Sequence, residues 1–514
     1  MAGKTIGKQA VVIGAGMSGL AAAGALADHF ERVIVLERDR LPSQAVPRTG
    51  TPQSRHLHVL LPGGQRALTD LFPHFERDLT NAGSVPLRMA RDIRMEIPGL
   101  GPLPPRDFGW FIHCASRPLI ELVTRRQVER IANVTIRPEC RVLEITTVPD
   151  GTMVTGVAYE DADGRREILA ADLVVDASGR AAPTLGLLRS SGQPAPDEIA
   201  IGIDLHYTTT SFVIPQDAPT DWRGVATWPH APERTHGGYM MPIEGNRWLM
   251  TLAGQCGEQA PDEPEGFMDY ARTLETQTIY NAIKHAERNG EFERYAFQAS
   301  VWRRFDRLGA FPRLLLPIGD SICRFNPVYG QGMSVAAQEA RLLNQILKGR
   351  AAEPDPFAEL AQLFFSETLP LLDATWNMSA VPDLAYPKTR GDRPADLESQ
   401  LQYNKALFQA AIRHPAVHCK LAEVQQLLEP PRVLQNPAID RLVQIELSKM
   451  AADAKEGHFL NFGEKLDEIV SRFLVEESLD GIIGALELKL IALREQECDV
   501  TRALTGGPTG KLPL

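Results

Sequence analysis

Val11-Val-Ile-Gly-Ala-Gly-Met-Ser-Gly-Leu20 is the stretch from which the fold of this chain can be deduced. Apolar residues before Gly14 form a strand, and small residues after Gly19 form a helix over 20–26. In such a unit the first glycine permits a tight turn, Gly16 lets a pyrophosphate approach the backbone, and the third glycine lets the helix pack closely. The helix N-terminus then supplies free N–H groups and the positive end of its dipole. This order of elements predicts a dinucleotide-binding βαβ unit.

An acidic residue follows at the distance that this unit requires. Val33-Ile-Val-Leu36 reads as the second strand, and Glu37 closes it, 18 residues beyond Gly19. A carboxylate at this place takes the ribose hydroxyls of the nucleotide. The glycines and the acid do not by themselves separate NAD from FAD.

A second glycine-rich segment lies roughly three hundred residues further along the chain. Leu314-Leu-Leu-Pro-Ile-Gly-Asp320 reads as a buried strand that ends in an aspartate, and Gly330-Gln-Gly-Met333 opens a helix over 334–347. This segment resembles the Gly-Asp motif of the glutathione-reductase-type FAD fold. The resemblance implies that Asp320 binds the ribityl chain and that the helix N-terminus faces the N1/C2 edge of the flavin. The two segments together predict FAD.

Composition excludes several other classes of protein. The chain has 514 residues and a net charge of −11, which argues against nucleic acid as the main partner. It holds no run of about twenty apolar residues that could cross a bilayer, and its first residues do not form a secretory signal. Six cysteines are scattered without a Cys-x-x-Cys pair, which indicates a reduced, cytoplasmic protein without a zinc site.

The predicted fold class is α/β, with a Rossmann-type FAD domain, an inserted β-sheet substrate domain and a helical C-terminal region. Alternating apolar residues predict strands between the second and third pieces of the FAD domain. Apolar residues at a helical period, from Leu466 to Leu486, predict helices near the end of the chain. The predicted boundaries are 1–85, 112–200 and 305–354 for the FAD domain, 86–111 and 201–304 for the substrate domain, and 355–514 for the helical region.

Four segments carry a resemblance to flavin-dependent monooxygenases of the aromatic-hydroxylase and squalene-epoxidase type. They are Gly14 to Gly19, Pro47-Arg-Thr-Gly-Thr-Pro-Gln-Ser-Arg-His-Leu-His58, Asp176-Ala-Ser-Gly-Arg180, and Gly319 to Met333. The second and fourth are most similar to the polyene epoxidases of polyether-antibiotic biosynthesis, of the lasalocid and monensin type. The third departs from the family pattern, because Ala181-Ala-Pro183 replaces the commoner Gly-Ser.

The resemblance implies a reaction in secondary metabolism. One oxygen atom of O2 would pass through a flavin C4a-hydroperoxide to a C=C bond of an apolar polyene, terpenoid or polyketide. Such a transfer requires a dry cavity over the flavin and no protein nucleophile. Electrons would come from NADPH or NADH, directly or through a separate flavin reductase as a partner, and the protein would be a monomer or homodimer.

The same resemblance assigns residues to the site. His56 and His58 are expected near the flavin, and no catalytic side chain or metal ligand is identified. The expected cofactor-binding residues are Gly14, Gly16, Ser18, Gly19, Glu37, Arg38, Arg48, Arg117, Val142, Asp176, Gly319, Asp320, Pro327, Gly330, Gly332 and Met333. The expected walls of the substrate pocket are Trp110, Tyr207, Tyr239, Met241, Trp248 and Trp302.

Other reactions on this fold remain to be weighed. Flavin halogenases need a lysine beside the flavin, and this chain has none between Lys8 and Lys284. Their Trp-x-Trp-x-Ile-Pro signature would fall on Gly237-Gly-Tyr-Met-Met-Pro242, where both tryptophans are missing. Halogenation is therefore disfavoured. Phenol hydroxylation is the close competitor, and a non-oxygenating isoprenoid reductase or cyclase is a further alternative.

Overall fold

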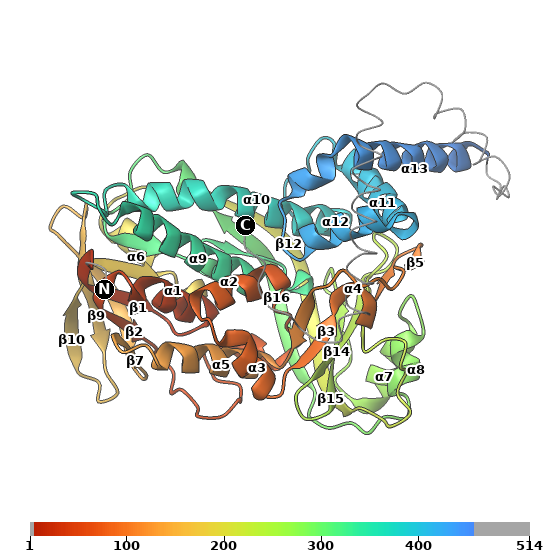
Figure 1. The fold of residues 1–514 in the computed structure, drawn as a ribbon, viewed down its shortest axis with the longest axis horizontal. Helices are drawn as coiled ribbons and strands as arrows, with labels where there is room; N and C mark the ends of the chain where they lie inside the picture. Colours follow the sequence, from red (N-terminus) through yellow and green to blue (C-terminus); the bar gives the residue numbers. More distant parts are fainter. Residues whose placement is uncertain (1–4, 457–514) are drawn as a thin grey trace, which may run out of the picture. The chain divides into compact units, whose positions relative to one another are not determined.

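The computed structural model describes residues 5–456. The helices predicted between Leu466 and Leu486 lie outside the described residues. The chain divides into two compact units, the first formed by 1–105 and 110–394, the second by 106–109 and 395–514. Each unit is described by itself below (Figure 1).

A five-stranded parallel sheet forms the core of the first unit. Its strands are rich in Val, Ile and Leu and buried on both faces, as expected for a parallel sheet that helices cover. The strand order is β17 (Leu315–Pro317), β11 (Leu173–Asp176), β1 (Gly7–Ile13), β2 (Phe30–Leu36), β7 (Val134–Arg137). Because the order reverses at β1, the loops after β1 and β11 diverge and leave a crevice at the carboxyl ends of the strands.

Helices α1 (Met17–Ala27) and α9 (Gly332–Arg350) pack against each other, and Figure 1 shows them side by side. Helix α2 (Pro62–Leu71) contacts α9 closely, since a Cβ on Gly64 would overlap Ser334. The backbone N–H of Leu61 donates to Ser334 Oγ at 2.9 Å. The two glycine-rich segments of the sequence are thereby held in one layer, although roughly three hundred residues separate them.

The first unit also contains an eight-stranded sheet. Its strand order is β18 (Cys323–Arg324), β16 (Glu293–Arg303), β12 (Glu198–Val213), β15 (Arg247–Gly254), β14 (His236–Ile243), β13 (Gly224–Thr227), β4 (Ile93–Ile97), β5 (Gly101–Pro102). Strand β18 follows Asp320 by only a few residues, so this sheet is tied to the Gly-Asp motif through hydrogen bonds between β18 and β16.

The two faces of this sheet have different neighbours. Trp248 and Met250 point to the face that α7 (Pro264–Arg272) and α8 (Thr278–Ile283) cover, where they join one apolar cluster. Tyr207 and Tyr239 belong to a separate cluster on the other face. The period-2 alternation of strand side chains therefore divides the residues that we expected to line one pocket.

Shorter elements complete the first unit. Strands β8, β9 and β10 form a three-stranded antiparallel sheet. The bounds are α3 (Phe75–Asn81), β3 (Val85–Arg88), α4 (Met89–Asp92), β6 (Phe111–Cys114), α5 (Arg117–Glu129), β8 (Arg141–Thr147), β9 (Val154–Glu160), β10 (Arg166–Ala170), α6 (Pro183–Ser190) and α10 (Leu360–Leu384).

The second unit is helical where it is described. It contains α11 (Leu397–Arg413), α12 (Pro415–Gln425) and α13 (Pro437–Glu456), which bury a small apolar core. Arg106 comes from the short segment 106–109 and donates to the carbonyl oxygens of Ala411 and Ile412 at 2.6 and 2.8 Å. Its guanidinium thus satisfies carbonyl groups at the C-terminal end of α11, where cations are favourable.

The predicted fold class is confirmed: the protein is an α/β protein with a Rossmann-type sheet, an added antiparallel sheet and a helical C-terminal region. The domain boundaries within the first unit stay a prediction. Within residues 5–456, no helix combines the length and the apolar character that crossing a membrane requires.

The packing of α1 on β1 yields a test. A Cβ at Gly19 would overlap the carbonyl oxygen of Gly14, which is backbone and cannot move aside. We expect Gly19→Ala to lower the free energy of unfolding by about 1–3 kcal/mol, the usual cost of overpacking. Gly186→Ala in α6 is the matched control, because open space surrounds that helical glycine and the change should be neutral or stabilising. Equal denaturant midpoints for the two variants would contradict this packing.

Candidate functional site

The loops that follow β1, β2, β11 and β17 meet at one edge of the parallel sheet. Gly14 has a φ of +98° and donates its N–H to Leu36 O at 2.8 Å. Ala177 N–H donates to Ile13 O at 3.0 Å, and Ile318 N–H donates to Asp176 O at 3.0 Å. These bonds between loops bring the predicted cofactor-binding segments together around the crevice.

The glycine loop after β1 fits a dinucleotide. Apart from its neighbours in the chain, no described residue comes within 4 Å of a Cβ placed on Gly16, and helix α1 begins there without a side-chain cap. The first N–H groups of the helix are therefore open to an acceptor. Ser18 and Gly14 are also partly exposed along this edge, while Gly19 is buried against β1. Free donors and free space are what the pyrophosphate of FAD requires.

Glu37 lies where a nucleotide ribose would bind. Its carboxylate is buried and accepts hydrogen bonds from Ala15 N–H at 2.8 Å and Asp39 N–H at 3.0 Å. Cys140 N–H donates to the backbone carbonyl oxygen of Glu37 at 2.8 Å, which ties the residues just before β8 to Glu37, and Val142 near the start of β8 is partly buried. Arg38, by contrast, is largely exposed.

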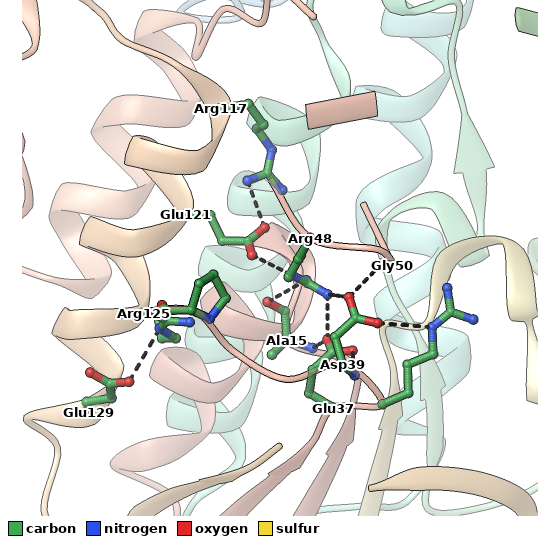
Figure 2. A network of polar contacts seen from close by, with 11 residues as sticks. Ala15, Glu37, Asp39, Arg48, Gly50, Arg117, Glu121, Arg125 and Glu129 are labelled. Carbon is green, nitrogen blue, oxygen red and sulfur yellow. Dashed lines mark hydrogen bonds and ion pairs between the residues drawn. The ribbon is translucent and has the colours of Figure 1, made fainter. Parts of the chain in front are cut away.

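Arg48 is the centre of a buried network of charges, drawn in Figure 2. Its guanidinium lies 2.7 Å from Asp39 and Glu121 and 3.3 Å from Glu37, and it donates to Ala15 O at 3.3 Å. Burial alone would lower the pKa of Arg48, but Glu121 and Glu37 outweigh it and raise that pKa. The resulting permanent cation holds the strand-end carboxylates against the glycine loop.

Arg117 extends this network from the first turn of α5. The side chain is 5% exposed, and its Nη1 donates to Glu121 Oε2 at 2.9 Å. Burial raises the pKa of the Glu121 carboxyl, yet Arg117 and Arg48 together hold it below the usual range. The shared carboxylate of Glu121 thus fixes both predicted cofactor-binding arginines in position relative to each other.

Asp176 is fully buried, and its carboxylate accepts hydrogen bonds from the loop that follows it. One carboxylate oxygen accepts from Ser178 N–H and Oγ at 3.1 and 2.6 Å, and the other accepts from Thr184 N–H and Oγ1 at the same two distances. These bonds shape the turn over 177–184 and occupy both oxygens of the carboxylate. Arg180, from the same motif, is exposed.

Gly319 and Asp320 lie opposite the glycine loop. A Cβ at Gly319, whose φ is +66°, would overlap Ser18 Oγ, so the two loops can approach only because residue 319 is glycine. Asp320 remains partly exposed. Burial raises the pKa of its carboxyl against the opposing charges of Arg324 and Arg303.

Glu339 of α9 holds the turn at Gly319 and Asp320 in place through a hydrogen bond. It is fully buried and accepts a hydrogen bond from Gly319 N–H at 2.7 Å, while its other oxygen has no partner among the described residues. Burial raises the pKa of Glu339 to about 8, opposed by the bond from Gly319 and aided by the charge of Asp320.

The N-terminus of α9 is also open to a ligand. Gly330 has a φ of +68° and ends the 3-10 turn Pro327–Tyr329, after which α9 begins without a side-chain cap. Gly332 lies close to Asp320, since its Cβ position is 3.9 Å from Asp320 Oδ1. Pro327, Gly332 and Met333 are all partly exposed. The residues present therefore fit both ends of an FAD molecule.

The two histidines of the 47–58 segment are uncharged at neutral pH. Burial lowers the pKa of His56 to about 3 and that of His58 to about 4, and a nearby charge lowers each further. His56 Nδ1 lies 2.7 Å from Thr209 Oγ1, and the ring lies between Tyr207 and Tyr295 at centroid distances of 5.9 and 5.5 Å. His58 Nδ1 donates to His56 O at 3.0 Å. At neutral pH neither ring therefore carries the additional proton that a general acid would transfer.

The six predicted pocket walls are dispersed in the structure. Tyr207 and Tyr239 share an apolar cluster with Phe297, and Met241 lies further along the same face of β14 with a different cluster. Trp248 packs on the opposite face of the sheet. Trp302 lies against Trp376 of α10 with ring centroids 5.7 Å apart, and Trp110 is partly exposed.

Sequence reasoning missed several residues of the Tyr207 cluster. Trp228 stacks on Tyr329 with ring centroids 5.6 Å apart and meets Tyr239 edge-on at 5.4 Å. Asp383 of α10 is 1% exposed and accepts hydrogen bonds from Asn326 at 3.0 Å and Tyr329 at 3.1 Å. The only available signal was the tyrosine and asparagine of the Asn326–Met333 run. Among the described residues, no group of His, Cys, Asp and Glu is arranged to hold a metal ion.

Comparison with known proteins agrees with this geometry. The sequence model of the family described as FAD binding domain matches residues 8–353, more than half of the chain. The chain therefore belongs to this family, as an enzyme with an FAD-binding domain. A relative from Mycobacterium tuberculosis (strain H37Rv), Protein Rv3254, is 33% identical over 408 residues, which are 75% of this chain and 83% of the relative.

Solved structures share the fold at low sequence identity. The flavin-dependent brominase Bmp2 aligns with a TM-score of 0.59 and 13% identity, over 85% of this chain and 100% of that one. PqsL of Pseudomonas aeruginosa, in complex with 2-aminobenzoylacetate, aligns with a TM-score of 0.57 and 17% identity, over 74% of this chain and 96% of that one. At such identities the likeness shows the common architecture alone.

Glu339 makes the stability of the site depend on pH. Its pKa is about 8 in the folded chain and near its ordinary value of 4.5 when unfolded, so the folded state keeps a proton that the unfolded state loses. Stability contributed by the neutral carboxyl is therefore lost as pH rises from about 4.5 through 8, by at most about 1.4 kcal/mol per pH unit. We expect Glu339→Gln to flatten this fall in melting temperature. If the melting temperatures of the wild type and of Glu339→Gln fell in parallel between pH 4.5 and pH 8, the raised pKa of Glu339 would be contradicted.

Proposed function

We propose that the protein is an FAD-dependent monooxygenase that adds one oxygen atom of O2 to an apolar substrate. One observation carries the proposal: an aromatic-rich cluster of the inserted sheet meets the two segments expected to border the flavin. Leu57, from the 47–58 segment, and Val328, from the Asn326–Met333 run, both pack against the cluster of Tyr207, Tyr239 and Phe297. An apolar surface beside the flavin is what oxygen transfer to a C=C bond or an aromatic ring requires.

Different residues of the chain would bind the different parts of FAD. The uncapped N-terminus of α1 would bind the pyrophosphate, and Glu37 the adenosine ribose. Asp320 would hold the ribityl chain, and the N-terminus of α9 would present its positive end to the flavin ring. When bound, FAD supplies the redox chemistry and the activation of O2. The network around Arg48 fixes the geometry of the nucleotide end.

The substrate would occupy the region next to Tyr207. The open hollow of about 300 Å³ in this part of the sheet is bordered by Tyr207 and Tyr295, but most of its lining alternates with them and lies on the side of Ala260 and the α7/α8 cluster, so it does not carry this assignment. The resemblance of the 47–58 and 319–333 segments supports epoxidation of a polyene, terpenoid or polyketide as the finer proposal.

Two other chemistries fit less well. The structural similarity to a flavin-dependent brominase makes halogenation a candidate reaction. However, the chain has no lysine between Lys8 and Lys284 to serve beside the flavin. Phenol hydroxylation favours a base near the ring. The lowered pKa values of His56 and His58 make both imidazoles weak bases, and the carboxylate of Asp383 already accepts hydrogen bonds from Asn326 and Tyr329. Oxygen transfer to a C=C bond needs no such base.

The cofactor assignment can be tested by one substitution. We expect Asp320→Ala to purify as a folded but colourless protein, because the ribityl chain loses the carboxylate that would bind its hydroxyl groups. Asp163→Ala, in the exposed turn between β9 and β10, is the control and should remain yellow. Flavin absorbance per mole of protein is the measurement. Full FAD content in the Asp320 variant would refute the assignment of this segment.

The reaction class can be tested by following the flavin. FAD-loaded protein would be reduced under argon with NADPH, or with dithionite if NADPH fails, and mixed with oxygenated buffer in a stopped-flow instrument. We expect a transient absorbing species before the oxidised spectrum returns, and a product that gains one oxygen atom and loses a C=C bond when geraniol is supplied. Reoxidation in one phase with geraniol unchanged would favour the reductase or cyclase alternative. Reduction by dithionite alone would indicate a separate reductase.

A further inference from the structure

The hydroxyl group of Tyr239 is buried without a hydrogen-bond partner. The residue is 7% exposed, and no described residue donates to or accepts from its hydroxyl oxygen. A buried polar group that is left unpaired costs about 1–3 kcal/mol, so a tyrosine at such a place needs an explanation.

Two neighbouring phenols, by contrast, have hydrogen-bond partners. Tyr329 donates to Asp383 Oδ1 at 3.1 Å, and Tyr386 donates to Arg234 O at 2.8 Å. Asp383 also accepts from Asn326, so its carboxylate is held by the loop that precedes α9. The structure thus provides partners for the hydroxyl groups on either side and none for Tyr239.

Most side chains around Tyr239 are apolar or aromatic, and Thr251 lies across from it on β15. Tyr239 shares its cluster with Leu205, Ala226 and Phe297, and Trp228 meets its ring edge-on. Val328 packs against the same cluster and belongs to the loop expected to bear the flavin. A ligand that entered here would be enclosed by apolar surface and would meet a single unpaired hydroxyl group close to the flavin.

We propose that Tyr239 forms a hydrogen bond to one oxygen atom of the substrate, which is therefore an apolar chain or ring that carries a hydroxyl or carbonyl group. This inference rests on the proposed monooxygenase function and narrows its substrate class, because a pure hydrocarbon would leave the hydroxyl group unpaired. Burial raises the pKa of Tyr239 well above its usual value, so the phenol keeps its proton and can donate to the substrate oxygen. Tyr239 acts as a positioning residue, not as a catalyst.

Equilibrium dialysis of the FAD-loaded full-length protein tests the proposal with two ten-carbon acyclic terpenoids. Geraniol carries a hydroxyl group, and myrcene is a hydrocarbon. We expect the wild type to bind geraniol about fivefold more tightly than myrcene, the ratio that one net hydrogen bond supplies. Tyr239→Phe should abolish that preference by weakening geraniol binding alone. It should leave the melting temperature of the ligand-free protein unchanged or raised, because an unpaired hydroxyl group is removed.

Tyr386→Phe is the matched control, since it removes a phenol hydroxyl from the same cluster that is already bonded to Arg234 O. This variant should lose stability and keep the preference for geraniol. Equal binding of the two terpenoids by the wild type, a preference that persists in Tyr239→Phe, or binding of neither compound would overturn the proposal. Dialysis does not depend on turnover, so its failure is distinguishable from failure of the stopped-flow experiment, which tests the monooxygenase reaction itself.

Discussion

The close approach of helix α1 to strand β1 is the constraint on which the rest of the first unit depends. A side chain at Gly19 would overlap the Gly14 carbonyl oxygen, and one at Gly319 would overlap Ser18. With glycine at both positions, the glycine loop and the Gly-Asp turn lie against each other. Helix α9, which follows that turn, then packs on α1. Two helix N-termini consequently open onto one crevice, which is the arrangement that an extended dinucleotide requires.

Buried acidic side chains at this edge are accommodated in two different ways. Around Arg48, carboxylates from the loop after β2 and from helix α5 surround guanidinium groups, so that these charges are paired. Beneath Gly319, Glu339 has no cation beside it and is accommodated by retaining its proton. The second arrangement depends on pH, because the pKa of Glu339 is raised to about 8. The loop after β2 is thus held by ion pairs, and the turn at Gly319 by a hydrogen bond to Glu339.

The pleat of the inserted sheet divides its aromatic residues between two faces. Alternate residues of β14 and β15 point to opposite faces, so Trp248 packs on α7 and α8 while Tyr239 faces the loops near the expected flavin. A list of aromatic residues drawn from the sequence could not make this distinction, because it depends on which face each helix covers. Trp228, from the segment after β13, and Asp383, from α10, join the face of Tyr239 only through tertiary packing.

The sequence by itself determined the βαβ unit, the Gly-Asp turn and the fold class, because these depend on glycine positions and short apolar runs whose geometry is local. It also placed Glu37 and Asp320 at strand ends, where parallel strands necessarily bring them to one edge. Only the tertiary structure decided that Asp176 bonds to its own loop, that Arg48 and Arg117 share Glu121, and that the buried hydroxyl group of Tyr239 has no partner among the described residues. Those outcomes depend on contacts between segments far apart in the chain, and no local pattern encodes them.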